Sequence, residues 1–232
     1  MTQRVSALVR YFLRSLLFSL TGFLCILLAL VCWWVLFDPR QTTPHVDYYI
    51  LMLSLLGAAF TLLVTLTIAA HANRAIHYPW LVRLHKRVEY LAAVLTSALC
   101  FGTLLQLLVA VLATHNGPRF TPGAVLQMPL IWLPVNVLAA ILALHASDMC
   151  AVGWSRVYLF GGLLALYFGQ KVNVIGPILR IVFWPFGAIA DAMQTGSFEP
   201  ILMAIGIVLL YAAVLLKLVI ELFVAKDLDL TE

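Results

Sequence analysis

Charged residues are scarce in this chain: only 10% of its 232 residues are Asp, Glu, Lys or Arg, whereas 64% are hydrophobic. A soluble domain has about a quarter of its residues charged. The composition therefore excludes a soluble globular protein and predicts an all-α, polytopic membrane protein. The net charge of +4 would favour nucleic acid in a soluble chain. Because the cations here cluster beside apolar spans, we expect no nucleic-acid partner.

Motifs of common catalytic and cofactor sites are also missing. The sequence has no nucleotide-binding glycine loop, zinc signature or catalytic-serine motif. The four cysteines lie in or beside apolar segments without a C-x-x-C pair, which argues against a disulfide framework or a metal site. They are Cys25, Cys32, Cys100 and Cys150. We therefore expect no enzymatic activity, no metal and no cofactor in this chain.

Six apolar stretches are predicted to be membrane spans, since about 20 residues at about 1.5 Å each cross the hydrocarbon core. The whole chain, residues 1–232, is then a single transmembrane domain. The predicted spans are residues 17–37, 48–70, 91–114, 124–146, 157–174 and 200–224.

The segment after the fourth span admits two interpretations. In the first, residues 157–174 form a fifth span and residues 175–195 form a re-entrant or interfacial helix. In the second, the segment contains two separate short elements. We prefer the first, because small residues recur there at a spacing that suits close helix packing. They are Gly161, Ala165 and Gly169.

Residues 1–15 show apolar positions at three- and four-residue spacing, with Arg10 and Arg14 together on the other side. This pattern predicts an amphipathic helix lying at the membrane surface. A cleaved signal peptide is the alternative, because a basic start precedes an apolar run. The absence of a small-x-small exit before Trp33 and Trp34 favours an uncleaved span.

Lysine and arginine residues orient the spans. With the N-terminus inside, nine cations lie on the cytoplasmic side and four outside, which predicts cytoplasmic location for both termini. The cytoplasmic set is Arg4, Arg10, Arg14, Arg74, Arg83, Lys86, Arg87, Arg156 and Lys226. The outside set is Arg40, Arg119, Lys171 and Arg180.

Residues 71–90 form the longest polar interruption, which we call the elbow. Within it, apolar side chains can share one face of a short helix over residues 75–87, with basic side chains elsewhere. The apolar set is Ile76, Trp80, Leu81 and Leu84, and the basic set is Arg83, Lys86 and Arg87. Such a helix either rests on anionic membrane lipid or inserts into a cleft of a cytoplasmic partner. Glu89 is placed to neutralise one of these cations.

Two residue pairs support alternative functions. Lys217 and Glu221 lie one helical turn apart inside a predicted span, where an ion pair can serve an ion-coupled secondary carrier. They can also simply pair with each other near the interface. His71 and His145 could approach matched depths, as haem ligation in a haem- or quinone-associated membrane subunit requires. Interfacial histidines in wet surroundings are the simpler interpretation.

The layout resembles the transmembrane permease subunit of ABC-2 type (type V) ABC transporters. The similarity covers nearly the whole chain, but it is one of hydropathy and charge rather than of fixed residues. The matching features are the amphipathic N-terminal helix, six spans, a basic elbow with WLVRLHKRVEYLAAVL running into span three, the interruption after span five and the ending ELFVAKDLDL. The chain departs from the family in lacking a large extracellular domain and a fused ATPase domain.

The resemblance implies that the elbow is a coupling helix. It would dock on a separate cytoplasmic ATP-binding subunit, which would hold ATP and Mg²⁺, and a second transmembrane subunit, identical or homologous, would complete the pathway. The implied contact residues are Ile76, Tyr78, Trp80, Leu81, Arg83, Leu84 and Arg87, with Glu89 in the hinge.

The resemblance also implies export from the cell inner membrane. The spans have no continuous acidic or basic lining, which favours an amphiphilic substrate over a small hydrophilic ion. We therefore expect a lipid, a hydrophobic peptide or a drug-like amphiphile as the substrate.

Overall fold

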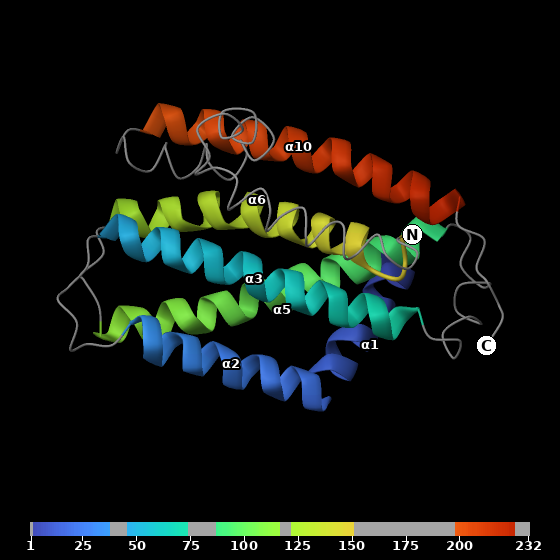
Figure 1. Cartoon of the computed structure of the whole chain (residues 1–232), viewed down its shortest axis with the longest axis horizontal. Helices are drawn as coiled ribbons and strands as arrows, with labels where there is room; N and C mark the ends of the chain where they lie inside the picture. The colour runs from blue at the N-terminus through green and yellow to red at the C-terminus, as the bar shows by residue number, and fades with distance from the viewer. Residues whose placement is uncertain (1, 38–45, 74–86, 117–121, 151–197, 226–232) are drawn as a thin grey trace, which may run out of the picture.

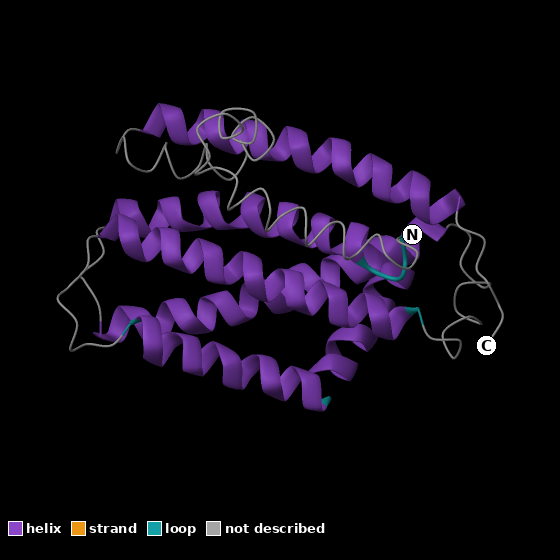
Figure 2. Ribbon diagram, viewed as in Figure 1, coloured by secondary structure: helices purple, strands orange, loops and turns teal. Residues whose placement is uncertain are grey.

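The computed structural model describes residues 2–37, 46–73, 87–116, 122–150 and 198–225, and within these ranges the regular structure is entirely helical (Figures 1 and 2). This confirms the prediction of an all-α protein. The helices are α1 (Thr2–Leu17), α2 (Leu20–Leu36), α3 (Val46–Ala72), α5 (Arg87–Asn116), α6 (Pro122–Ala146) and α10 (Phe198–Ala225).

Four of these helices, α3, α5, α6 and α10, are long and apolar enough to cross a membrane. The pair α1 and α2 also passes this test, but its two parts meet at a bend of 70°. The helical membrane class is thus confirmed, whereas the count of six spans stays a prediction. Residues 157–174 and 175–195, with the small-residue seam at Gly161, Ala165 and Gly169, lie outside the described residues.

The helices form a bundle centred on α3, which packs against both α5 and α6 (Figure 1). Helix α10 covers α6, and helices α1 and α2 pack against α5. Helix α5 begins at Arg87, four residues before the predicted start of its span at residue 91. The reason is that Arg87–Tyr90 is helical but polar, so hydropathy places it in the loop.

Helix α1 has the predicted amphipathic character. Leu8, Phe12 and Leu16 are buried, whereas Arg10 and Arg14 are exposed. The helix packs on α5, so protein covers its apolar face, and its predicted position at the membrane surface stays a prediction. This contact fixes α1 to the bundle.

A hydrogen-bonded cap produces the bend between α1 and α2. The Ser19 hydroxyl donates to the Leu16 carbonyl at 2.7 Å and accepts from the Gly22 amide at 3.0 Å. A Cβ atom at Gly22 would lie 2.9 Å from the Leu16 carbonyl carbon and closer still to its oxygen. Glycine is therefore required for the chain to turn this tightly.

Neutral polar side chains join the three central helices. The Gln106 amide on α5 donates to the Leu53 carbonyl on α3 at 2.9 Å, and Asn136 on α6 donates to the Gln106 side-chain oxygen at 2.6 Å. Both side chains are fully buried. Because lipid offers no hydrogen-bonding partner, such groups hold membrane helices in one register.

Two glycines bring these helices close together. Gly57 on α3 faces the Gln106 side chain, and Gly102 on α5 faces Thr61 on α3. A Cβ atom at Gly102 would lie 2.8 Å from the Thr61 Cα, which is backbone and cannot rotate away. Gly206 on α10 has no such neighbour within 4 Å. The central seam therefore depends on small residues in α3 and α5.

We predict that Gly102→Ala lowers the free energy of unfolding by about 1–3 kcal/mol, because overpacking forces α3 and α5 apart. The matched control Gly206→Ala should be neutral or slightly stabilising, since alanine favours helix. Unfolding in mixed detergent micelles, followed by circular dichroism, measures both. Equal stability of the two variants would contradict the packing.

Candidate functional site

The two ends of the elbow are joined by Tyr90. Its hydroxyl on α5 donates to the Ala72 carbonyl at the end of α3 at 2.8 Å. Tyr90 is only 1% exposed. The carbonyl belongs to the last turn of α3, where backbone acceptors have no partner within the helix. The bond therefore closes the base of the elbow.

Tyr90 also contacts helix α1. Its ring meets the Phe12 ring edge to face, with centroids 5.7 Å apart and planes at 76°. Aromatic pairs favour this arrangement because the positive edge of one ring meets the negative face of the other. A displacement of Tyr90 would therefore move α1 as well as α3.

Arg87 links the same place to helix α10. Its guanidinium donates to the Val224 carbonyl at 3.2 Å. A cation is favourable there, because the last carbonyls of a helix carry partial negative charge. We call the set Phe12, Ala72, Arg87, Tyr90 and Val224 the clasp. It connects α1, α3, α5 and α10 at the base of the elbow.

Glu89 lies in the first turn of α5, between two members of the clasp. It is 6% exposed, and its Oε2 atom has no hydrogen-bond partner in the described part of the chain. A buried carboxylate is costly unless a cation or donor meets it. Glu89 was predicted to neutralise Arg83, Lys86 or Arg87. The guanidinium of Arg87 donates to the Val224 carbonyl. Arg83 and Lys86 lie outside the described residues, so a pairing with either stays a prediction.

The other residues of the predicted elbow contact also fall outside the described ranges. They are Ile76, Tyr78, Trp80, Leu81, Arg83 and Leu84. Sequence reasoning named Arg87 and Glu89 but missed Phe12, Tyr90 and Val224. These three act through contacts between helices far apart in the chain, for which no local pattern exists.

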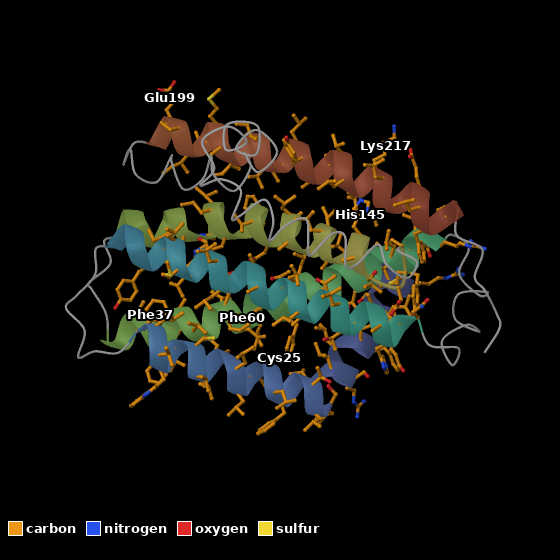
Figure 3. The ribbon with its side chains drawn as sticks, in the orientation of Figure 1. Cys25, Phe37, Phe60, His145, Glu199 and Lys217 are labelled. Atoms are coloured by element: carbon orange, nitrogen blue, oxygen red, sulfur yellow. The ribbon has the colours of Figure 1, made fainter. Side chains whose placement is uncertain are left out.

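Lys217 and Glu221 form the predicted pair, with Nζ and Oε1 3.9 Å apart. Their side chains are 79% and 62% exposed, and Figure 3 shows Lys217 on the side of α10 that faces away from α6. Such a pair contributes little stability. It does not face the interior of this bundle, so the geometry gives the carrier alternative no support.

His71 and His145 contact different helices. The His71 Nε2 atom lies 3.3 Å from the Ser15 hydroxyl on α1. His145 instead lies beside the Leu215 backbone on α10, and its Nε2 atom is buried without a hydrogen-bond partner among the described residues. The described ranges contain no cluster of three or more His, Cys, Asp or Glu residues able to hold a metal. No described contact brings the two histidines together for haem ligation.

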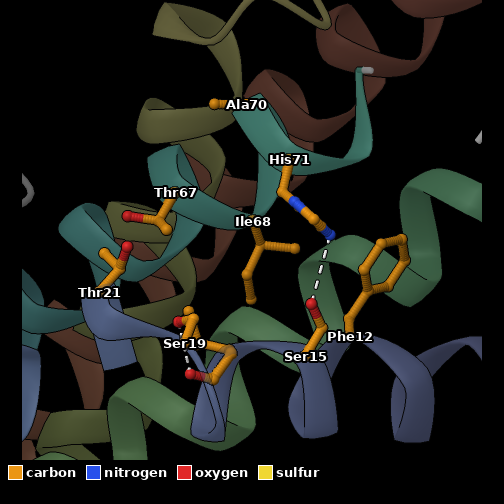
Figure 4. Close-up of a pocket in the computed structure, with 9 residues that line it drawn as sticks. Phe12, Ser15, Ser19, Thr21, Thr67, Ile68, Ala70 and His71 are labelled. Atoms are coloured by element: carbon orange, nitrogen blue, oxygen red, sulfur yellow. Dashed lines mark hydrogen bonds between the residues drawn. The ribbon is translucent and has the colours of Figure 1, made fainter. Parts of the chain in front are cut away.

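A cavity of about 480 Å³ lies on the inner side of the bend between α1 and α2 (Figure 4). It was not predicted, because it depends on the angle of the bend and on the end of α3. Its lining combines hydroxyl groups, one imidazole and apolar side chains. The lining residues are Phe12, Ser15, Leu16, Ser19, Thr21, Thr67, Ile68, Ala70 and His71.

We predict that Tyr90→Phe lowers the free energy of unfolding by about 1 kcal/mol, because the Ala72 carbonyl loses its donor while the ring contact with Phe12 remains. Tyr211→Phe on α10 is the control, since Tyr211 is only half-buried and makes no described hydrogen bond. Detergent unfolding of both variants is the measurement. An equal decrease in the free energy of unfolding in both variants would contradict the role given to the Tyr90 hydroxyl.

Comparisons with known proteins gave no match from which a function could be transferred to this site. No model of a protein family matches the chain, and neither a curated protein nor a solved structure matches it. The functional argument therefore rests on the residues and contacts described above.

Proposed function

We propose that this chain is the permease subunit of an ATP-driven transporter of the ABC-2 type, and that its elbow docks on a separate cytoplasmic ATP-binding subunit. A second transmembrane subunit, identical or homologous, completes the pathway. The observation that carries the proposal is the clasp. The polar loop that resembles a coupling helix leads directly into residues that contact three other helices.

Mechanical coupling follows from these contacts. A push on the elbow acts first on Ala72 and Arg87, where α3 ends and α5 begins. Tyr90 ties these two ends together, so α3 and α5 move as a unit. Phe12 and Val224 pass the displacement to α1 and α10. Coupling requires contacts that differ between two states, and the clasp is where such a difference can arise.

Glu89 supplies the electrostatic part of this coupling, which we call the switch. In the proposal, an elbow cation, Arg83 or Lys86, meets the buried carboxylate in one state and leaves it in the other. The difference is large because a buried charge without a partner is strongly disfavoured. The position of Glu89 beside Tyr90 makes the clasp sensitive to the position of the elbow.

The interior of the described bundle supports an amphiphilic substrate. Apart from Glu89 at the base of the elbow, its buried polar side chains are all neutral. They are Ser54, Thr61, Thr65, Ser97, Gln106, Asn136 and Ser147. A route for small ions needs charged groups or closely spaced dipoles along its length. A lipid, a hydrophobic peptide or a drug-like amphiphile therefore fits the proposal better.

Charge reversal in the elbow tests docking. We expect Arg83→Glu to reduce co-purification of the ATP-binding subunit by about tenfold or more, because an interfacial cation loses its partner. Arg83 is preferable to Arg87, whose guanidinium also holds the end of α10. The readout is mass spectrometry of the tagged chain isolated from its source cells.

Arg4→Glu is the matched control, since Arg4 is an exposed cation on α1. It should leave the ATP-binding subunit bound. Retention of that subunit by Arg83→Glu would contradict docking through the elbow. If the wild-type chain carries no Walker-type ATPase in the same preparation, the proposed function itself is wrong.

Glu89→Gln separates coupling from assembly. The variant keeps the shape of the side chain and removes a buried charge, so the free energy of unfolding should stay the same or rise. The ATP-binding subunit should remain bound, whereas substrate-stimulated ATP hydrolysis should fall by about tenfold, the equivalent of one hydrogen bond to a charged group. Normal stimulation in this variant would exclude Glu89 from the switch.

A further inference from the structure

Helix α10 has two opposite faces. Its buried residues recur at three- and four-residue spacing, which defines one side of a helix, and this side packs mainly on α6. They are Ile201, Ala204, Val208, Ala212, Val219 and Phe223. The opposite side, which we call the outer face, is exposed in the described part of the chain. It carries Met203, Leu210, Val214, Lys217 and Glu221.

The outer face of α10 differs from the other large exposed surface, that of α2. Helix α2 contains no charged residue, as contact with lipid requires. On α10, by contrast, the side chains of Lys217 and Glu221 are 79% and 62% exposed. Lys217 lies seven residues before Val224, the end of the span, which places its backbone about 10 Å inside the apolar layer. Charges facing hydrocarbon are costly, so the outer face favours a protein partner.

Lys217 and Glu221 satisfy each other only in part. Nζ and Oε1 are 3.9 Å apart, which is too long for a hydrogen bond. In the described part of the chain, neither group has a second ion-pair partner. An ammonium group has three donors and a carboxylate has two acceptor oxygens, so most of their bonding capacity stays open. The partner that fits offers both an anion and a cation, one helical turn apart.

A second copy of this chain has the required charge pattern. A two-fold axis brings the same face of both copies together. With this axis along the bilayer normal, the two α10 helices run parallel. Lys217 of each copy can then reach Glu221 of the other, because charges about one turn apart pair across the seam of parallel helices. One loose pair within a chain thus becomes two pairs between chains.

We propose that two copies of this chain associate through the outer face of α10, with Lys217 of each copy paired to Glu221 of the other and Leu210 packed in the same seam. The inference deepens the proposed function and rests on it for its role, because the second transmembrane subunit is then an identical copy. Glu221 lies three residues before Val224, whose carbonyl accepts from Arg87. A movement of the clasp would therefore reach the second copy through the end of α10.

Complementary charge reversal tests this contact. Energy transfer between donor- and acceptor-labelled full-length chains in phosphatidylcholine vesicles measures association. Lys217→Glu leaves two anions on the outer face, and Glu221→Lys leaves two cations. Each variant alone should associate about tenfold more weakly than the wild type, because like charges meet across the seam. A mixture of the two variants should regain wild-type association, because it restores every pair between copies while the pair within each copy stays broken.

Arg4→Glu is the matched control, since it makes the same change of charge at an exposed position on α1. It should associate like the wild type, and recovery in the mixture shows that both α10 variants fold. A mixture as weak as the single variants would overturn the pairing between copies. A wild-type chain without energy transfer above that of random mixing would overturn the second copy as the partner. The vesicles contain no ATP-binding subunit, so either failure leaves docking through the elbow intact.

Discussion

The hydrogen bonds of Gln106 are the interaction on which the rest of the structure depends. This side chain is buried where lipid surrounds the bundle, so its amide must find partners in α3 and α6, and it does so at Leu53 and Asn136. These bonds form only if Gly57 and Gly102 let the backbones approach. The register of α3, α5 and α6 is thereby fixed, because sliding one helix would leave polar groups unpaired.

The outer helices are attached to this rigid centre in a different way. Helices α1 and α10 are connected at the base of the elbow through Phe12, Tyr90, Arg87 and Val224. The outer surface of α10 is largely exposed. Because α1 and α10 also pack on the central helices along their length, a local push at the base of the elbow can become a tilt of several helices. These contacts are the physical basis of the proposed coupling through the elbow.

The sequence predicted the helices better than it predicted their contacts. Hydropathy placed the spans now described as α3, α5, α6 and α10 to within four residues, because the bilayer imposes a length on apolar runs. Gln106 and Asn136 stand out as isolated polar residues in apolar spans, but their partners depend on helix rotation. The role of Tyr90 was missed for the same reason, because its partners lie on other helices. The cavity near His71 was missed because the 70° bend at Ser19 cannot be read from composition.

Movement at the base of the elbow tests the central claim most directly. Spin labels at Asn73, just after α3, and at Leu222, on the exposed side of α10, report the distance between two ends that the clasp connects. Pulsed electron paramagnetic resonance would measure this distance in the complex purified from source cells, with and without ATP and Mg²⁺. The account predicts that the distance distribution shifts on ATP binding. An unchanged distribution in a complex that hydrolyses ATP would contradict it.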